Sequence, residues 1–324
     1  MSEPLPEFDV LRPASIDEAV AMAAENPASR YVAGGSDLIV NMRRGLVDAD
    51  VLIDLSAISA LNEITITETG VMIGAGTSLA ALAGDPHLCA HYGAIAQAAG
   101  LVAGPGHREV GTIGGNLCLD TRCIFYNQSQ WWRKSNSFCL KHKGEICHVA
   151  PGGNECWAPF CGDLAPALLV HDAQIEIAGP GEHKARKRMA LAELYSGDGA
   201  DPFTLPDGML LVAVHVPTST RRSRYEKTRV RGSIDFPLAG VAVAVDAEGE
   251  IRIALTGTGT RPQLVEGLEK FNGQSLNTAE IEAIGKLTQK LASPMRTSTI
   301  SPRYRRVAAA ALAKRLVVQL ADVS

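Results

Sequence analysis

The chain has 324 residues, of which 46% are apolar and 20% are charged, as in an ordinary globular protein. Its 31 basic and 35 acidic residues give a net charge of −4, which argues against a nucleic-acid-binding protein or a basic membrane-binding surface. No apolar run is long enough to cross a bilayer, and the acidic, Pro-rich N-terminus does not resemble a signal peptide, so we expect a cytoplasmic protein with no nucleic-acid or membrane partner.

The first third of the chain predicts a small βαβ-like unit followed by a hairpin and helices. Ser15 to Glu18 form a capping box that opens a helix ending near Glu25. A helix at 38–44 lies between two predicted strands, at 30–33 and 51–55. The next elements are a hairpin and two helices, at 64–75, 78–83 and 92–103, whereas the Gly-rich stretch 104–116 is predicted to be irregular.

Regular structure is expected again from Asp163 onward, with a strand at 174–178. The polar and basic stretch 217–224 predicts a domain boundary. Beyond it the pattern predicts three strands and two helices, at 224–230, 238–245, 251–256, 278–291 and 304–321. We therefore expect an α+β protein with lobes at 1–57 and 58–217 and a C-terminal domain at 218–324.

Two glycine-containing loops are candidates for binding a phosphate group. The loop at 32–38 lies between a predicted strand and helix, where backbone N–H groups and a helix N-terminus favour an anion. The stretch from Thr112 to Asn116 offers a second loop with a hydroxyl and an amide. Either one alone is more often a plain turn, and neither has the Walker A or Rossmann spacing, but together they suit a pyrophosphate.

Three motifs resemble the FAD-binding medium subunit of the molybdenum hydroxylases, the family of xanthine dehydrogenase and aerobic carbon monoxide dehydrogenase. They are Ala33-Gly-Gly-Ser-Asp-Leu38, Thr112-Ile-Gly-Gly-Asn116 and Gly162-Asp-Leu-Ala-Pro-Ala167, and the C-terminal half adds Tyr225-Glu-Lys227 and Asp235-Phe-Pro-Leu238. The resemblance covers nearly the whole chain. It implies a two-lobed FAD-binding domain of the PCMH type and a C-terminal α+β domain that closes over the FAD.

The resemblance also implies which residues bind FAD. Two loops would hold the pyrophosphate, and they comprise Tyr31, Val32, Ala33, Gly34, Gly35, Ser36, Asp37, Leu38, Gly111, Thr112, Ile113, Gly114, Gly115 and Asn116. Val102 would pack beside the isoalloxazine, Asp163 would lie near the adenosine, and Lys227 near the flavin ring. From the residues alone, a helix cap explains Asp163 equally well, and an exposed strand lysine explains Lys227 better.

Six of the seven cysteines and all three tryptophans lie between Cys118 and Cys161. In a reducing cytoplasm, metal binding explains such clustering better than disulfides do. From the residues alone, a four-cysteine zinc site and an iron–sulfur cluster are about equally supported. The aromatic residues are expected to form a small core for this segment, or to shield a cluster from water.

The cysteine segment also resembles one branch of the family. Most members pass almost directly from Gly-Gly-Asn to the Asp-x-Ala-Pro-Ala motif, and this chain inserts about forty residues there. The run from Asn116 to Arg133 is similar to the β subunit of 4-hydroxybenzoyl-CoA reductase, whose insert carries a [4Fe–4S] cluster. Carried over by position, the four ligands are Cys123, Cys139, Cys147 and Cys156. Cys118 is then a packed thiol, and Cys161 is not a ligand.

The resemblance implies an electron-transfer subunit with no catalytic side chain of its own. Ferredoxin would supply electrons to the [4Fe–4S] cluster and FAD, and partner subunits with molybdopterin and [2Fe–2S] centres would use them to remove the hydroxyl of 4-hydroxybenzoyl-CoA. One alternative is the same subunit of a hydroxylase or dehydrogenase for another aromatic or heterocyclic substrate. Another is a stand-alone flavin oxidase whose insert is held by zinc.

Overall fold

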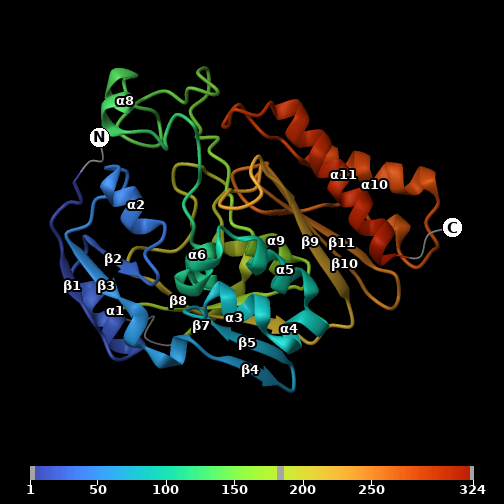
Figure 1. Ribbon diagram of the computed structural model, residues 1–324, viewed down its shortest axis with the longest axis horizontal. Coiled ribbons are helices and arrows are strands. Elements are labelled where there is room, and N and C mark those ends of the chain that lie inside the picture. The colour runs from blue at the N-terminus through green and yellow to red at the C-terminus, as the bar shows by residue number, and fades with distance from the viewer. Residues whose placement is uncertain (1–3, 181–185, 322–324) are drawn as a thin grey trace.

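Three β-sheets, each covered by helices, follow one another along the chain in the computed structural model, which describes residues 4–180 and 186–321 (Figure 1). The sheets use residues 9–54, 64–217 and 222–264. An α+β protein with a two-lobed N-terminal part and a C-terminal domain is thereby confirmed, while boundaries at residues 57 and 217 stay a prediction. Within the described ranges, no helix has the length and apolarity needed to cross a bilayer.

The first lobe is a parallel sheet in the order β1-β3-β2, formed by Asp9–Leu11, Val51–Asp54 and Ser29–Val32. Helix α1 (Ile16–Glu25) begins where predicted, because the Ser15 hydroxyl accepts a hydrogen bond from the N–H of Glu18. Helix α2 (Leu38–Arg43) connects β2 to β3. Two 3-10 turns, Leu55–Ala57 and Ser59–Leu61, lead into the second lobe.

The second lobe is a five-stranded antiparallel sheet in the order β4-β5-β8-β6-β7. Its strands are Ile64–Thr67, Gly70–Gly74, Leu210–Pro217, Gln174–Ala178 and Lys187–Ala190. One face packs on helices α3, α4, α5 and α9, which are Leu79–Gly84, Pro86–His91, Gly93–Leu101 and Leu164–Leu169. The other face packs on α1, through Leu210 and Val212. A further 3-10 turn is Leu191–Leu194.

The stretch at 104–116 is helical, so the prediction of irregular structure there was wrong. Helix α6 (Pro105–Val110) starts with proline at its first turn, where the missing N–H costs nothing. Helix α7 (Ile113–Leu117) is capped by Thr112, whose hydroxyl accepts from the N–H of Gly115. Glycine and proline at these positions begin the helices rather than prevent them.

The C-terminal domain is a four-stranded antiparallel sheet in the order β12-β11-β10-β9, formed by Gln263–Leu264, Ile251–Thr256, Ala239–Val245 and Arg222–Thr228. Alternate residues of β10 face opposite ways. Val241 and Val243 pack on α10 (Thr278–Leu291) and α11 (Pro302–Leu320), whereas Ala242 and Ala244 pack on the second lobe. A 3-10 turn of the domain is Glu269–Phe271. The domain therefore has its own core and a second buried face.

The cysteine insert contains one short helix, α8 (Gln130–Ser135), and otherwise irregular chain. In Figure 1 it lies at the top of the molecule, between α2 and the loop that leads into α11. Arg133 donates to the carbonyls of Arg44 and Gly45 in the first lobe, both at 2.8 Å. The N–H of Ile124 donates to Thr297 in the C-terminal domain. The insert is thus fixed to the lobes on either side of it.

Candidate functional site

The first glycine loop joins β2 to α2. Gly35 has a φ of +64°, and across the described chain the N–H groups from Gly34 to Asp37 have no acceptor within the protein. The Asp37 carboxylate does not cap α2; it accepts from the Asn41 amide at 2.8 Å. Free N–H groups in a left-handed turn form a concave site for an anion, as expected for this loop.

The second glycine loop uses its N–H groups within the fold. Ile113 and Gly114 donate to the carbonyls of Thr77 and Ala75, and Gly115 donates to Thr112. The Asn116 side chain accepts from the N–H of Leu164 at 2.9 Å. This loop therefore supports the first one and the start of α9, and most of its N–H groups are already bonded within the described chain.

The two loops touch backbone to backbone. A Cβ atom added to Gly34 would lie 1.9 Å from the carbonyl oxygen of Val110 and 3.0 Å from the nitrogen of Gly111, at the start of the second loop. A Cβ atom on Gly114 would lie 2.8 Å from the carbonyl oxygen of Ala75, which follows β5. Neither contact leaves room for a side chain. Glycine is therefore required at Gly34 by the approach of the loops, whatever is bound there.

A cavity of about 640 Å³ opens beside the loops, between the first lobe and the segment at 202–211. Its size suits a dinucleotide, and most of its wall is apolar. Six of the residues predicted to bind FAD line it: Tyr31, Ala33, Leu38, Thr112, Gly114 and Gly115. Tyr31 donates to the carbonyl of Gly208, and burial raises its pKa to about 12, so it binds as a neutral phenol.

Asp163 and Lys227 form a buried ion pair that neither line of sequence reasoning predicted. Their side chains are 3% and 1% exposed and 2.9 Å apart, and the Tyr225 hydroxyl donates to Asp163 at 2.6 Å. Burial raises the pKa of Asp163, while Lys227 and Tyr225 oppose that rise. Asp163 does not cap α9, and Lys227 is not an exposed strand lysine.

The resemblance implies a place near the adenosine for Asp163 and near the flavin ring for Lys227, and the structure brings these two side chains into contact. Both roles stay predictions. Neither residue lines the cavity, and neither does Val102, which ends α5 and whose carbonyl accepts from Arg108.

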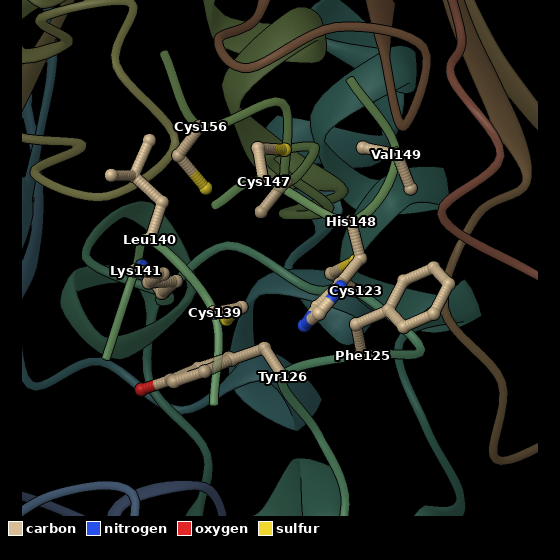
Figure 2. A pocket seen from close by; sticks show the side chains of 11 residues that line it. Cys123, Phe125, Tyr126, Cys139, Leu140, Lys141, Cys147, His148, Val149 and Cys156 are labelled. Carbon is tan, nitrogen blue, oxygen red and sulfur yellow. The ribbon is translucent and has the colours of Figure 1, made fainter. Parts of the chain in front are cut away.

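Four cysteines of the insert line one small cavity of about 20 Å³ (Figure 2). They are the four predicted ligands: Cys123, Cys139, Cys147 and Cys156. Around them lie mainly apolar and aromatic side chains: Phe125, Tyr126, Leu140, Val149 and Ala158. The structure thus gathers four thiols that are separated by fifteen, seven and eight residues in the chain.

Tight turns present these thiols. The carbonyl of Cys123 accepts from Tyr126 and Asn127, and that of Cys147 accepts from Ala150. The carbonyl of Cys139 accepts from His142 and Gly144. Ser137, Phe138 and Lys143 have φ values near +60° around that turn, which side chains rarely adopt. Loops rather than helices deliver the sulfurs, as predicted.

The thiols lie close enough to affect one another. Burial, with smaller contributions from Cys139 and Cys147, raises the pKa of Cys123 to about 11. Burial also raises the pKa of Cys156 to about 11, with added effects from Cys147 and Cys123. Such thiols are neutral at pH 7 and become thiolates only when cations compensate the charge.

The spacing of these thiols differs from that of a single-ion site. In the part of the chain that the structure describes, no group of three or more His, Cys, Asp or Glu side chains is placed to hold one metal ion. A zinc ion with four sulfurs at about 2.3 Å would bring those sulfurs within about 4 Å of one another. Within the described residues, the four thiols are therefore not placed as the ligands of one metal ion.

Cys118 and Cys161 stay outside this cavity. Each is separated from a predicted ligand by four intervening residues, a spacing that zinc knuckles also use, so the sequence alone could not exclude them. Cys161 is buried, as a non-ligand may be. Cys118 is not the packed thiol that was predicted: it is open to the 640 Å³ cavity, although surrounding protein raises its pKa to about 12.

Three charged residues of the site were not singled out from the sequence. Arg122 forms an ion pair with Asp37, Lys141 forms one with Asp120 at 2.8 Å, and Asp120 lines the 640 Å³ cavity. Their partners are 85 and 21 residues away, so no local pattern reveals them. The tryptophans were expected to form a small core or to shield a cluster, but Trp131 is 74% exposed.

Comparison with known proteins matches the N-terminal and C-terminal parts of the chain to two family models. Residues 6–219 match the family described as the FAD binding domain in molybdopterin dehydrogenase, and residues 223–320 match the CO dehydrogenase flavoprotein C-terminal domain. These descriptions name FAD and a flavoprotein but no iron–sulfur cluster. FAD binding therefore follows from the family, whereas the cluster depends on the cysteines of the insert.

Individual relatives agree along most of the chain. The aldehyde oxidoreductase FAD-binding subunit of Escherichia coli (strain K12) is 32% identical over 78% of this chain and 81% of its own length. The carbon monoxide dehydrogenase medium chain of Afipia carboxidovorans is 27% identical over 96% of this chain and 95% of its own length. A chain in the crystal structure of cyanide-inactivated Cu,Mo-CO dehydrogenase superposes with a TM-score of 0.78, at 26% identity over 97% of both chains.

Proposed function

Since the chain belongs to the family of FAD-binding subunits of the molybdenum hydroxylases, we propose that it is an electron-transfer subunit that carries both FAD and a [4Fe–4S] cluster. FAD would bind at the 640 Å³ cavity, with its pyrophosphate on the free N–H groups of the loop from Gly34 to Asp37. The cluster would be held by Cys123, Cys139, Cys147 and Cys156. A cluster exchanges single electrons and a flavin exchanges one or two, so the pair joins the two kinds of chemistry.

One observation carries this proposal: four thiols, and no other cysteines, surround one cavity in the insert. A cubane cluster takes one thiolate per iron, and that is the number present. The walls are mainly apolar and aromatic, and such surroundings would influence the potential of a cluster bound there.

The test is chemical analysis of the full chain, purified without oxygen. We expect about one flavin and about four iron and four sulfide ions per chain, and little zinc. An electron-paramagnetic spectrum of the reduced protein should show a cubane signal. A protein with flavin and zinc but no iron would instead favour the oxidase with a zinc-held insert, and a protein with neither flavin nor iron would refute the proposal.

The resemblance of the insert supports a finer proposal for the whole complex. A molybdopterin-containing large subunit and a [2Fe–2S] small subunit would be its partners, ferredoxin its electron donor, and reductive removal of the hydroxyl of 4-hydroxybenzoyl-CoA its reaction. Turnover of the whole complex with this thioester and a low-potential donor tests the reaction. Turnover only with another aromatic or heterocyclic substrate, with electrons leaving through FAD, would favour a hydroxylase or dehydrogenase.

A further inference from the structure

Two cations of the cysteine insert pair with carboxylates of the proposed FAD site, one in the first glycine loop and one in the wall of the 640 Å³ cavity. Arg122, the residue before Cys123, forms an ion pair with Asp37 in the first glycine loop. Lys141, two residues after Cys139, forms one with Asp120, whose side chain lines the cavity. Asp37 and Asp120 are thus each paired with a cation that lies one or two residues from a proposed cluster ligand.

Asp37 has an unfavourable place for a carboxylate in a phosphate-binding loop. It follows the free N–H groups of Gly34 to Ser36, where a pyrophosphate would bring two negative charges. Apart from Arg122, its side-chain partner is the neutral amide of Asn41. Arg122 is 14% exposed and stacks on the ring of Phe236 at 4.6 Å, so it is held in place from the C-terminal domain as well.

Lys141 connects the two cavities directly. It is one of the residues that line the four-cysteine cavity, beside Tyr126 in Figure 2. Its side chain is 4% exposed, and its ammonium donates to the carbonyls of Gly199 and Ala200 as well as to Asp120. A shift of the turn at Cys139 would therefore move this charge away from Asp120.

We propose that Arg122 and Lys141 make FAD binding depend on the state of the cysteine insert. With the insert ordered around its cofactor, both carboxylates are neutralised and the pyrophosphate binds. With the insert disordered, Asp37 and Asp120 repel the pyrophosphate. This inference rests on the proposed function, and by linkage FAD must strengthen retention of the cluster by the same factor.

The test measures the dissociation constant of FAD by flavin fluorescence, using the full chain after removal and return of FAD. The Arg122→Gln variant should bind FAD about tenfold more weakly, since an unpaired carboxylate faces the pyrophosphate. Adding Asp37→Asn to that variant should restore the affinity, because the repelling charge is gone. Lys134→Gln, which removes an exposed cation from α8 in the same insert, should have no effect.

The coupling itself is measured by comparing cluster-loaded protein with the Cys139→Ser variant. Loss of the cluster should weaken FAD binding about tenfold in the otherwise native chain, and much less when Asp37→Asn and Asp120→Asn are both present. If FAD affinity is the same with and without the cluster, or if Asp37→Asn fails to rescue Arg122→Gln, the inference is overturned. Both results presuppose that the native chain binds flavin and iron; a native chain that binds neither refutes the proposed function instead.

Discussion

The cysteine insert and the C-terminal domain are held together in opposite ways. The C-terminal domain buries a large apolar core between its sheet and two long helices. The insert has one six-residue helix and a small buried cluster, to which Leu46 of the first lobe contributes. Its order comes instead from turns, left-handed residues and polar contacts to the neighbouring lobes.

The difference shows what a cofactor can contribute to a fold. A domain with its own core is stable without a ligand, whereas a segment with little apolar burial needs covalent or ionic links. Within this chain, the four thiols are the strongest links available to the insert. We therefore expect two groups of variants: those that remove the cofactor from the insert, and those that lower the stability of the rest of the chain.

The largest effect is expected from Cys139→Ser or Cys147→Ser. Each removes one of four thiolate ligands, so the iron and sulfide content should fall from about four each per chain to a small fraction of that amount. The insert should then be cut by proteases near Ser137 and Lys143, while circular dichroism of the remainder stays native. Cys161→Ser is the matched control, because that thiol is also buried in the insert but lies outside the cavity; equal iron loss in both variants would contradict the ligand set.

Lys227→Met should be the most destabilising change outside the insert. It leaves the Asp163 carboxylate buried without its cation, which costs about 3–5 kcal/mol of unfolding free energy. Because burial raises the pKa of Asp163, the lone carboxyl takes up a proton readily, so the loss should be smaller at pH 5 than at pH 8. Denaturant unfolding of this variant, with the exposed Lys286→Met as its control, measures both effects. Iron content at permissive temperature should not change.

Leu316→Ala tests the independence of the C-terminal core. This side chain is fully buried against the sheet, and its truncation should lower the unfolding free energy by about 3 kcal/mol. Val318→Ala on the same helix is 49% exposed and should change stability by less than about 0.5 kcal/mol. Flavin and iron content are the second measurement; loss of iron from Leu316→Ala would show that the two regions do not fold separately.

A smaller effect is expected from mild acid, through His171 at the junction of the second lobe with β9. It shares a hydrogen bond of 2.9 Å with Ser223, and burial lowers its pKa to about 4. The folded-state pKa is below the unfolded value of about 6.5, so the unfolded state binds the proton first as pH falls. Stability should drop by about 2 kcal/mol between pH 7 and pH 5, a loss that His171→Asn removes. An unchanged pH profile in that variant would refute the assignment.

Elements with local signals were predicted well from the sequence. The caps at Ser15 and the strand periodicity of Ile251–Thr256 depend on neighbours a few residues away. Strand β8 (Leu210–Pro217) was missed, although it lies at the centre of the five-stranded sheet. Both of its partner strands are distant in the chain, and the polar stretch that begins at Pro217 indicated a domain boundary rather than a strand.

The site residues show the same contrast between local signals and contacts that are distant in the chain. The four cysteines could be chosen only through the resemblance of the insert, because their spacing matches no general pattern. Lys227 looked like a surface residue, because its partner Asp163 lies 64 residues away. Charges that meet across lobes, such as Arg122 and Asp37, follow from tertiary contacts that no periodicity encodes.

The close approach at Gly34 means that the two glycine loops already touch, so no hinge has to close to bring them together. We therefore expect nucleotide binding to require little ordering of these loops. A methyl group at this one position would act as a wedge, and both loops would separate together.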